Sequence, residues 1–219
     1  MLSLAEEILL LSLLEKKESL RLSSSLSLPF VLSGAVILDL ILSGMLKMED
    51  ERLVSTGIPI QPGNETRKDL LEIIEHSEKP RKLNHWVYIL GAKGKRISKP
   101  LILALIKKGI LLQEKKAFQW VRFEHDGVQR KEPIKYLLKR QLRDALFCEE
   151  ALSEHLTACL TLLDACDLLE HIFTKDEIVA ARKKLRSIKA EATYTQGFLE
   201  LLDQTLESIA YAVASAEKA

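Results

Sequence analysis

The stretch Leu26–Leu46, LSLPFVLSGAVILDLILSGML, decides how this chain can fold. Its length is about that of a helix that crosses a bilayer. However, a charge such as Asp39 costs about 2.5–3.5 kcal/mol in the middle of a membrane. Polar or helix-disfavouring residues also interrupt the run at Pro29, Ser33, Gly34 and Ser43. We therefore predict a buried core helix over Phe30–Ser43 that ends at Gly44, in a chain that at most rests on a membrane surface.

The rest of the chain predicts a mainly α, single domain over residues 1–219, with one or two short β-hairpins. Hydrophobic residues make up 47% of the 219 residues and aromatics only 5%, so the core must be largely aliphatic. A short hairpin is expected in Leu46–Ile60. Further helices are expected at Leu4–Leu14, Lys68–His76, Leu83–Leu90 (stopped by Gly91), Pro133–Cys148, Leu152–Glu170, Lys175–Lys189 and Ala192–Ala216.

Two further segments contain turn or proline signals. The apolar face of Ile97–Lys108 predicts a helix that ends at Gly109, and Pro100 is acceptable only in its first turn. The helix should then start near Lys99, which leaves Lys93–Lys99 as a basic loop or helix cap. Phe118–Phe123 alternates like a strand, and the turn Asp126-Gly127 predicts that Val128–Lys131 returns beside it.

Charge is strongly segregated along the chain, although the formal net charge is only +1. Residues 79–143 carry 18 Lys/Arg against 4 Asp/Glu, whereas residues 1–78 and 144–219 have net charges of −6 and −7. A block of this kind attracts a polyanion: phospholipid headgroups, nucleic acid or an acidic protein.

The densest part of this block offers a candidate anion site. Lys93, Lys95, Arg96 and Lys99 lie within seven residues, beside Gly91 and Gly94. Cations and the free N–H groups of a helix start would together bind a phosphate, with help from the hydroxyls of Ser23–Ser25. The alternative is a solvated basic turn.

Two more basic segments belong to the same positively charged block. The hairpin carries Phe118, Trp120, Arg122, Phe123, Arg130 and Lys131. It either dips into a membrane or self-associates, or it packs its aromatic face on the domain. Lys135, Lys139, Arg140 and Arg143 recur at helical spacing and are expected to form an exposed face that extends the basic surface.

Catalytic and metal-binding motifs are not apparent. The sequence has no nucleophile elbow, no HExxH and no close carboxylate pair in a polar cluster, and Glu6-Glu7 is interpreted as exposed helix charge. His155, Cys159, Asp164 and Cys166 do not have the spacing of a four-ligand metal site. We expect no metal, no cofactor and no enzymatic activity. The odd number of cysteines and the acidic start of the chain favour a cytoplasmic protein over a secreted one.

Several segments together resemble the Golgi phosphoprotein 3 family. Leu2–Leu11 (LSLAEEILLL) looks like the family's first helix, and Gly34–Leu46 (GAVILDLILSGML) is similar to its second, buried helix. Leu101–Lys107, followed by Lys108-Gly109-Ile110-Leu111, resembles the helix that ends in a basic residue, Gly and two aliphatic residues. A hairpin and further helices follow in the family's order, so the resemblance covers nearly the whole chain.

This resemblance implies a largely helical domain. In eukaryotic members of the family, such a domain binds phosphatidylinositol 4-phosphate at the cytosolic face of the Golgi and retains glycosyltransferases there; the family also has prokaryotic members, to which this chain could equally belong. The family's headgroup pocket uses a Trp and three Arg. These positions fall on or near Ser24, Ser33, Lys95 and Ser98, with Arg96 and Lys99 adjacent, so one of the four keeps a charge.

The leading hypothesis is therefore a peripheral membrane adaptor. Its partners would be an anionic lipid and a protein cargo, and it would self-associate through the hairpin. The alternative is a winged-helix-like protein that binds nucleic acid through a basic helix, a turn and a hairpin. The acidic flanks of the chain count against this alternative.

Overall fold

The computed structural model describes residues 2–16, 19–22, 25–58, 65–114, 117–120, 124–125, 128–129, 134–147, 152–188 and 196–218. The helices are α1 (Leu4–Ser12), α2 (Leu28–Leu42), α3 (Glu65–Glu75), α4 (Leu83–Ala92), α5 (Gly94–Lys107), α6 (Ile134–Phe147), α7 (Glu154–Ala165), the short 3-10 helix η1 (Leu169–His171), α8 (Lys175–Ile188) and α9 (Gln196–Ala216). The strands are β1 (Leu13–Lys16), β2 (Ser19–Leu22), β3 (Leu46–Glu49), β4 (Arg52–Ser55), β5 (Arg81–Lys82), β6 (Leu111–Glu114), β7 (Ala117–Trp120), β8 (Glu124–His125) and β9 (Val128–Gln129). The prediction of a mainly α fold with short hairpins is confirmed.

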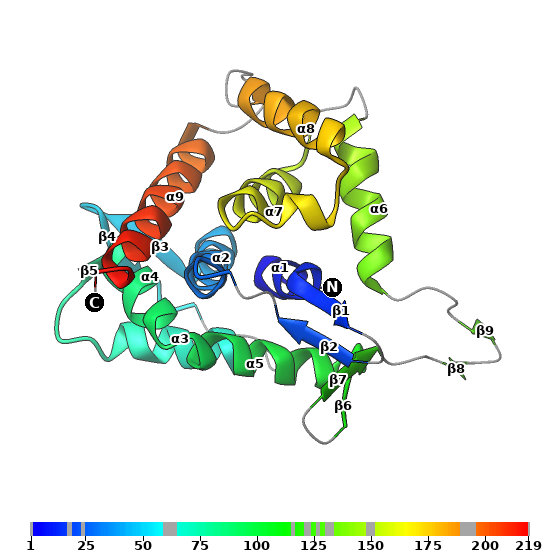
Figure 1. Ribbon diagram of the computed structural model, residues 1–219. Helices are drawn as coiled ribbons and strands as arrows, with labels where there is room; N and C mark the ends of the chain where they lie inside the picture. Colours follow the sequence, from blue (N-terminus) through cyan, green and yellow to red (C-terminus); the bar gives the residue numbers. More distant parts are fainter. Residues whose placement is uncertain are drawn as a thin grey trace.

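Helices α1 and α2 form the centre of the molecule, and the other helices surround them (Figure 1). Every residue of α2 from Phe30 to Leu40 is buried, and so are all residues of α1 except Glu7. Burying one Leu or Ile side chain contributes about 1.5–3 kcal/mol, so two helices that are apolar on all sides must lie inside. The predicted core helix is confirmed, and it ends at Gly44 in the left-handed conformation (φ 73°).

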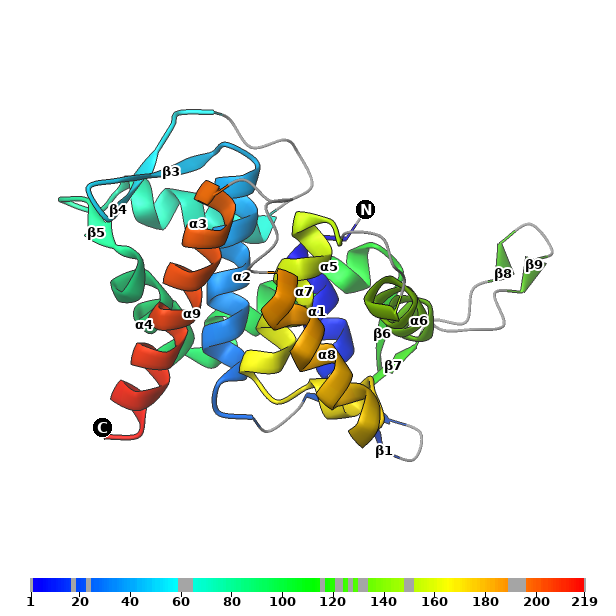
Figure 2. The same ribbon diagram turned by 90° about the horizontal axis from the view of Figure 1, so that it is seen from above.

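The helices around this centre form outer surfaces on opposite sides of the molecule. Helix α5 runs along one side of the molecule and α8 along the opposite side, as Figures 1 and 2 show from two directions. Helices α4 and α9 cover a third side, and α6 lies across the centre from them. The described helices include none that is both long and apolar enough to cross a membrane.

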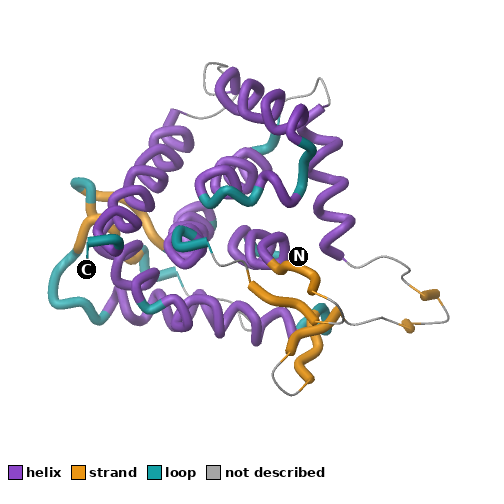
Figure 3. The backbone as a smooth tube through the Cα atoms, in the orientation of Figure 1, coloured by secondary structure: helices purple, strands orange, loops and turns teal. Residues whose placement is uncertain are grey.

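The strands form three small antiparallel sheets at the periphery (Figure 3). One has the order β1-β2-β7-β6, the second β3-β4-β5, and the third pairs β8 with β9. The predicted hairpin after α2 is confirmed as β3–β4, with Leu46 opposite Ser55.

The predicted pairing of Phe118–Phe123 with Val128–Lys131 is wrong. Strand β7 pairs with β6, with Phe118 opposite Gln113, and on its other side Phe118 lies opposite Leu20 of β2. Because β7 pairs with β6 on one side and with β2 on the other, it has no free edge for Val128–Gln129. Strand β9 pairs instead with the two-residue strand β8; Asp126 and Gly127, which stand between them in the sequence, lie outside the described residues.

The start of α5 also differs from the prediction. The helix begins at Gly94 rather than near Lys99, so Lys95, Arg96 and Lys99 lie on a helix, and Pro100 is inside it. A proline in a helix interior costs about 3 kcal/mol because its N–H is missing. The burial of Ile97, Leu101 and Leu105 on one face of α5 offsets this cost. The end of the helix is as predicted, with Gly109 at φ 67°.

The prediction that Gly91 ends the helix α4 is wrong. Gly91 lies inside the helix, is buried, and faces the ring of Phe30 on α2. A Cβ at this position would lie 2.2 Å from Cδ1 of Phe30. The glycine therefore permits the close approach of α4 to α2.

We predict that Gly91→Ala destabilises the protein by roughly 1–3 kcal/mol, because the aromatic ring must move to admit a methyl group. Gly197→Ala is the matched control, since Gly197 is also helical but a Cβ added there would have no neighbouring atom within 4 Å. It should stabilise by about 0.5–1 kcal/mol through helix propensity. The free energy of unfolding in urea measures both effects. If Gly91→Ala stabilised the protein, the close packing of α4 against Phe30 of α2 would be contradicted.

Candidate anion-binding surface

The exposed side of α5 carries a row of cations. Residues three or four apart share a helix face, and this rule groups Lys93, at the helix start, with Arg96, Lys99, Leu103 and Lys107. We call these five residues the basic stripe. All are exposed, and Leu103 retains 46% of its surface. A helix with cations around an exposed leucine has the composition of helices that lie on a membrane surface.

The cations of the stripe have no acidic partner in the described part of the chain. Lys93, Arg96, Lys99 and Lys107 form no ion pair there. The first turn of α5 has no acidic residue and no side-chain cap. Since the N-terminus of a helix carries partial positive charge, cations beside it add to an unfavourable potential. An incoming anion would relieve this potential.

The start of α2 lies beside the start of α5. A Cβ on Gly94 would be 3.2 Å from Cγ of Pro29. Just before α2, Leu26 is 72% exposed, and the hydroxyl oxygens of Ser25 and Ser27 are hydrogen-bonded at 2.8 Å. An exposed apolar side chain and two hydroxyls therefore lie just before the end of α2 that contacts Gly94 of α5.

The structure brings together some of the predicted site residues. Lys93, Arg96 and Lys99 are exposed on α5; Lys95 lies on the same helix, but its side chain is outside the described part. Ser24 lies outside the described residues. Ser33 is fully buried and donates its hydroxyl to the carbonyl of Pro29 at 2.8 Å, so it does not face a ligand. Ser98 likewise donates to the carbonyl of Gly94 at 3.0 Å.

The hairpin residues are only partly placed. Phe118 and Trp120 lie on β7, opposite Gln113 and Leu111 of β6. The other four residues predicted for the hairpin lie outside the described part of the chain: Arg122, Phe123, Arg130 and Lys131.

The predicted exposed basic face on α6 is only partly correct, because Arg140 and Arg143 are exposed whereas Lys139 is half-buried and Lys135 is buried. Lys135 is buried and donates to the carbonyl of Leu13 on β1, and Lys139 donates to the carbonyl of His171. Arg143 pairs with Glu177 of α8 at 2.9 Å. Lys135, Lys139 and Arg143 thus connect α6 to neighbouring elements, and a buried cation such as Lys135 requires a partner of this kind.

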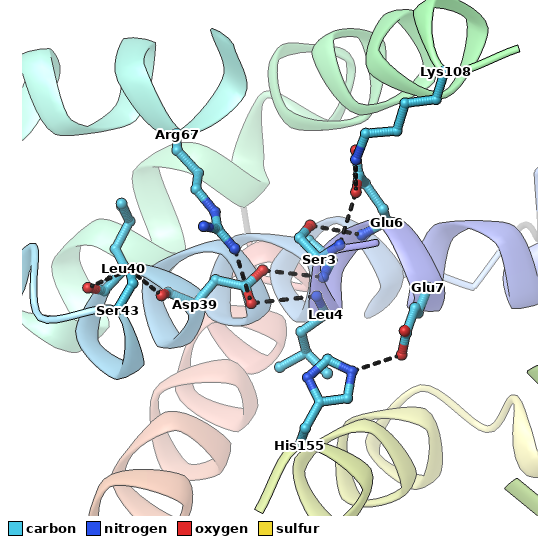
Figure 4. Close-up of polar contacts among 11 residues, drawn as sticks. Ser3, Leu4, Glu6, Glu7, Asp39, Leu40, Ser43, Arg67, Lys108 and His155 are labelled. Atoms are coloured by element: carbon cyan, nitrogen blue, oxygen red, sulfur yellow. Dashed lines mark hydrogen bonds and ion pairs between the residues drawn. The ribbon is translucent and has the colours of Figure 1, made fainter. Parts of the chain in front are cut away.

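A polar cluster at the N-terminus of α1, which was not predicted from the sequence, holds α5 in place (Figure 4). Glu6 is only 4% exposed, so its interpretation as exposed charge is wrong. Its carboxylate accepts from the backbone N–H of Ser3 at 2.8 Å and from Nζ of Lys108, at the end of α5, at 2.6 Å. The pattern Ser3-x-x-Glu6 is a capping box, and this signal was present in the sequence.

Asp39 of α2 is the second carboxylate of this cluster. Its oxygens accept from the backbone N–H groups of Leu4 and Ala5 at 3.3 and 3.4 Å, and Arg67 of α3 lies 3.3 Å away. Burial raises the pKa of Asp39, while Arg67 and the two N–H groups oppose this shift. The charge that excluded a membrane span therefore binds the positive end of α1.

Glu7 forms a third link, to α7. Its carboxylate accepts from Nε2 of His155 at 2.8 Å. This hydrogen bond raises the pKa of His155, burial opposes the shift, and Asp39 adds a smaller attraction. His155 is therefore charged at a higher pH than an ordinary histidine.

The described residues contain no cluster of three or more His, Cys, Asp or Glu that could hold a metal. Cys159 and Cys166 are buried, as predicted, and burial raises the pKa of the Cys166 thiol to about 12. A thiol with so high a pKa is a poor nucleophile.

A comparison with known protein families shows to which family the chain belongs. The family model described as Golgi phosphoprotein 3 (GPP34) matches residues 4–214, nearly the whole chain. The chain belongs to the Golgi phosphoprotein 3 family. No match is found among curated proteins. In this member of the Golgi phosphoprotein 3 family, the matched region includes the basic stripe, the hairpin β6–β7 and the polar cluster except for Ser3.

We predict that Asp39→Ala destabilises the protein by roughly 3 kcal/mol, because it leaves two N–H groups and Arg67 without their acceptor. Glu49→Ala removes one partner of the exposed pair Lys47–Glu49 and is the control, with an expected cost below about 1 kcal/mol. Chemical denaturation measures both. Equal losses would show that the cluster contributes no more than a surface pair.

The His155–Glu7 pair predicts a pH dependence. The folded state raises the pKa of His155, so the pair stabilises the protein fully below the ordinary histidine pKa and less as the pH rises through the raised value. His155→Gln should therefore cost more stability at about pH 5.5 than at about pH 8.5. His85, whose pKa burial lowers, should give the opposite trend in His85→Gln. If His155→Gln lowered the stability equally at both pH values, the stabilising role of the His155–Glu7 pair would be contradicted.

Proposed function

We propose that the protein is a non-enzymatic peripheral membrane adaptor that docks on anionic lipid headgroups through the basic stripe of α5. The observation that carries this proposal is the row of cations around exposed Leu103, which form no ion pair with the described residues. Cations near an anionic bilayer contribute about 1 kcal/mol each, and a partly inserted leucine adds apolar burial. Membership of the Golgi phosphoprotein 3 family supports the proposal.

The lipid in this proposal is a phosphorylated inositol lipid of the phosphatidylinositol 4-phosphate type. Arg96 supplies a forked donor for a phosphate, while Lys93 and Lys99 act as point charges beside it. Because Ser33 and Ser98 bond to their own helices, recognition would depend more on charge density than on an enclosed pocket. We therefore expect other multiply charged phospholipids to compete.

The proposal also includes a protein cargo and a role for the hairpin β6–β7. An adaptor at the membrane would carry a protein cargo on surfaces away from α5, and the hairpin β6–β7 would contribute membrane contact or self-association. This arrangement leaves α8, on the opposite side, facing the cytoplasm.

Vesicle sedimentation tests the proposal. Replacing Lys93, Arg96 and Lys99 together by Gln should weaken binding to vesicles that contain phosphatidylinositol 4-phosphate by roughly 100-fold at low salt. The matched control replaces Lys175, Lys183 and Arg186 of α8 by Gln, which removes the same charge from the opposite side. This control should bind almost as well as the wild type.

Three outcomes would contradict the proposal: equal binding to neutral and anionic vesicles, equal losses in the two triple variants, or no vesicle binding at all. Short duplex DNA is included at about 50 mM salt. Binding to DNA without binding to vesicles would favour the nucleic-acid alternative instead.

A further inference from the structure

A groove of about 500 Å³ lies between α3 and α5, beside the basic stripe. The two helices pack against each other (Figure 1), and α4 contributes to the floor. Of the basic stripe, only Arg96 lines the groove. The full lining is Asp69, Leu70, Glu72, Ile73, His76, Leu90, Arg96, Ile97 and Pro100.

Opposite charges line the two walls of this groove. Asp69 and Glu72 lie one turn apart on α3, both exposed, and Arg96 projects from α5. Asp69 and Arg96 do not pair with each other or with any other residue in the described part of the chain. The carboxylate of Glu72 has, among the described residues, only a long, exposed contact of 3.7 Å with Lys68 of its own helix. The groove thus holds charges of both signs that have no close partner in the described part of the chain.

The charges restrict the ligand. A purely anionic group would meet two carboxylates, and a purely cationic one would meet Arg96, so a ligand must carry both signs. The floor is apolar: Leu70, Leu90 and Ile97 are nearly fully buried, and Pro100 lies beside them. Methylene groups between the two charges would pack on this floor.

The cationic end of the ligand should be a primary ammonium. Its three donors match two carboxylates, whereas a quaternary ammonium has no donor and is held by aromatic side chains. Among the described residues, the only ring that lines the groove is the imidazole of His76. An ethanolamine headgroup therefore fits better than a choline headgroup.

We propose that this groove binds the headgroup of an ethanolamine phospholipid. The phosphate would lie on Arg96, the ammonium between Asp69 and Glu72, and the linking carbons on the apolar floor. This inference rests on the proposed membrane docking, because Arg96 belongs to both surfaces and would present the groove to the same bilayer. The groove would add a preference for one neutral lipid to the attraction for anionic ones.

Soluble headgroups test the groove without a membrane. Titration of the full chain with O-phosphoethanolamine and with phosphocholine, followed by amide chemical shifts, should show about tenfold tighter binding of the former. The shifts should concentrate on α3 and α5. Asp69→Asn with Glu72→Gln should remove the preference, and Arg96→Gln should weaken both ligands.

The control for charge is Asp144→Asn with Glu207→Gln, which neutralises two exposed carboxylates on α6 and α9 that do not line the groove. It should keep the preference. Equal binding of the two headgroups, or an unchanged preference in the Asp69/Glu72 variant, would overturn the inference. Shifts elsewhere, or a response only to a cationic peptide, would also overturn it.

Vesicles then separate this inference from the proposed function. Adding phosphatidylethanolamine to phosphatidylcholine vesicles leaves the net charge at zero, and should raise binding of the wild type but not of the Asp69/Glu72 variant. Lys93→Gln with Lys99→Gln should lose binding to anionic vesicles and retain the response to O-phosphoethanolamine. If the protein binds anionic vesicles but shows no preference for ethanolamine, the proposed ligand of the groove is contradicted and the docking surface is not. If it prefers ethanolamine but does not bind anionic vesicles, membrane docking through the basic stripe is contradicted.

Discussion

The structure depends on negative charge placed at the N-terminus of a buried helix. Helix α1 lies at the centre, where its first N–H groups cannot reach water, and Asp39 and the capping box of Ser3 and Glu6 accept their hydrogen bonds. Each carboxylate near this end has a partner on another helix: Arg67 on α3, Lys108 at the end of α5 and His155 on α7. One polar cluster thus fixes four helices around α1, in a core that is otherwise aliphatic.

This arrangement determines which surface faces outward. Lys108 is held by Glu6 at one end of α5, and Gly94 contacts Pro29 at the other, while Ile97, Leu101 and Leu105 are buried between them. The rotation of α5 about its axis is therefore fixed. Its remaining side presents Lys93, Arg96, Lys99 and Lys107 to the outside, without internal partners in the described part of the chain. On α6, by contrast, Lys135 holds the helix against β1 and Arg143 pairs with Glu177 of α8.

Local signals in the sequence predicted much of the fold. The apolar run around Asp39 and the glycines at positions 44 and 109 correctly predicted two helix ends, because a left-handed glycine is a local requirement. Pro100 and Gly91 misled because packing against α1, α2 and α3 overrides local propensity, and no residue near them reveals those neighbours. For the same reason, spacing alone could place Lys135 on a helix face but could not tell that the face is buried. Glu6 could have been assigned correctly, since its capping box is a local pattern.

The central claim is that the outward side of α5 is the side that meets the membrane. A fluorophore sensitive to polarity, attached to Leu103→Cys in a Cys148→Ser background, tests this claim most directly. Val179→Cys on α8, where the native side chain is 70% exposed on the opposite side, serves as the reference position. On binding to anionic vesicles, the label at position 103 should brighten and shift to the blue, and the label at 179 should not change. A bound protein whose label responds at 179, or at neither position, would contradict the claim.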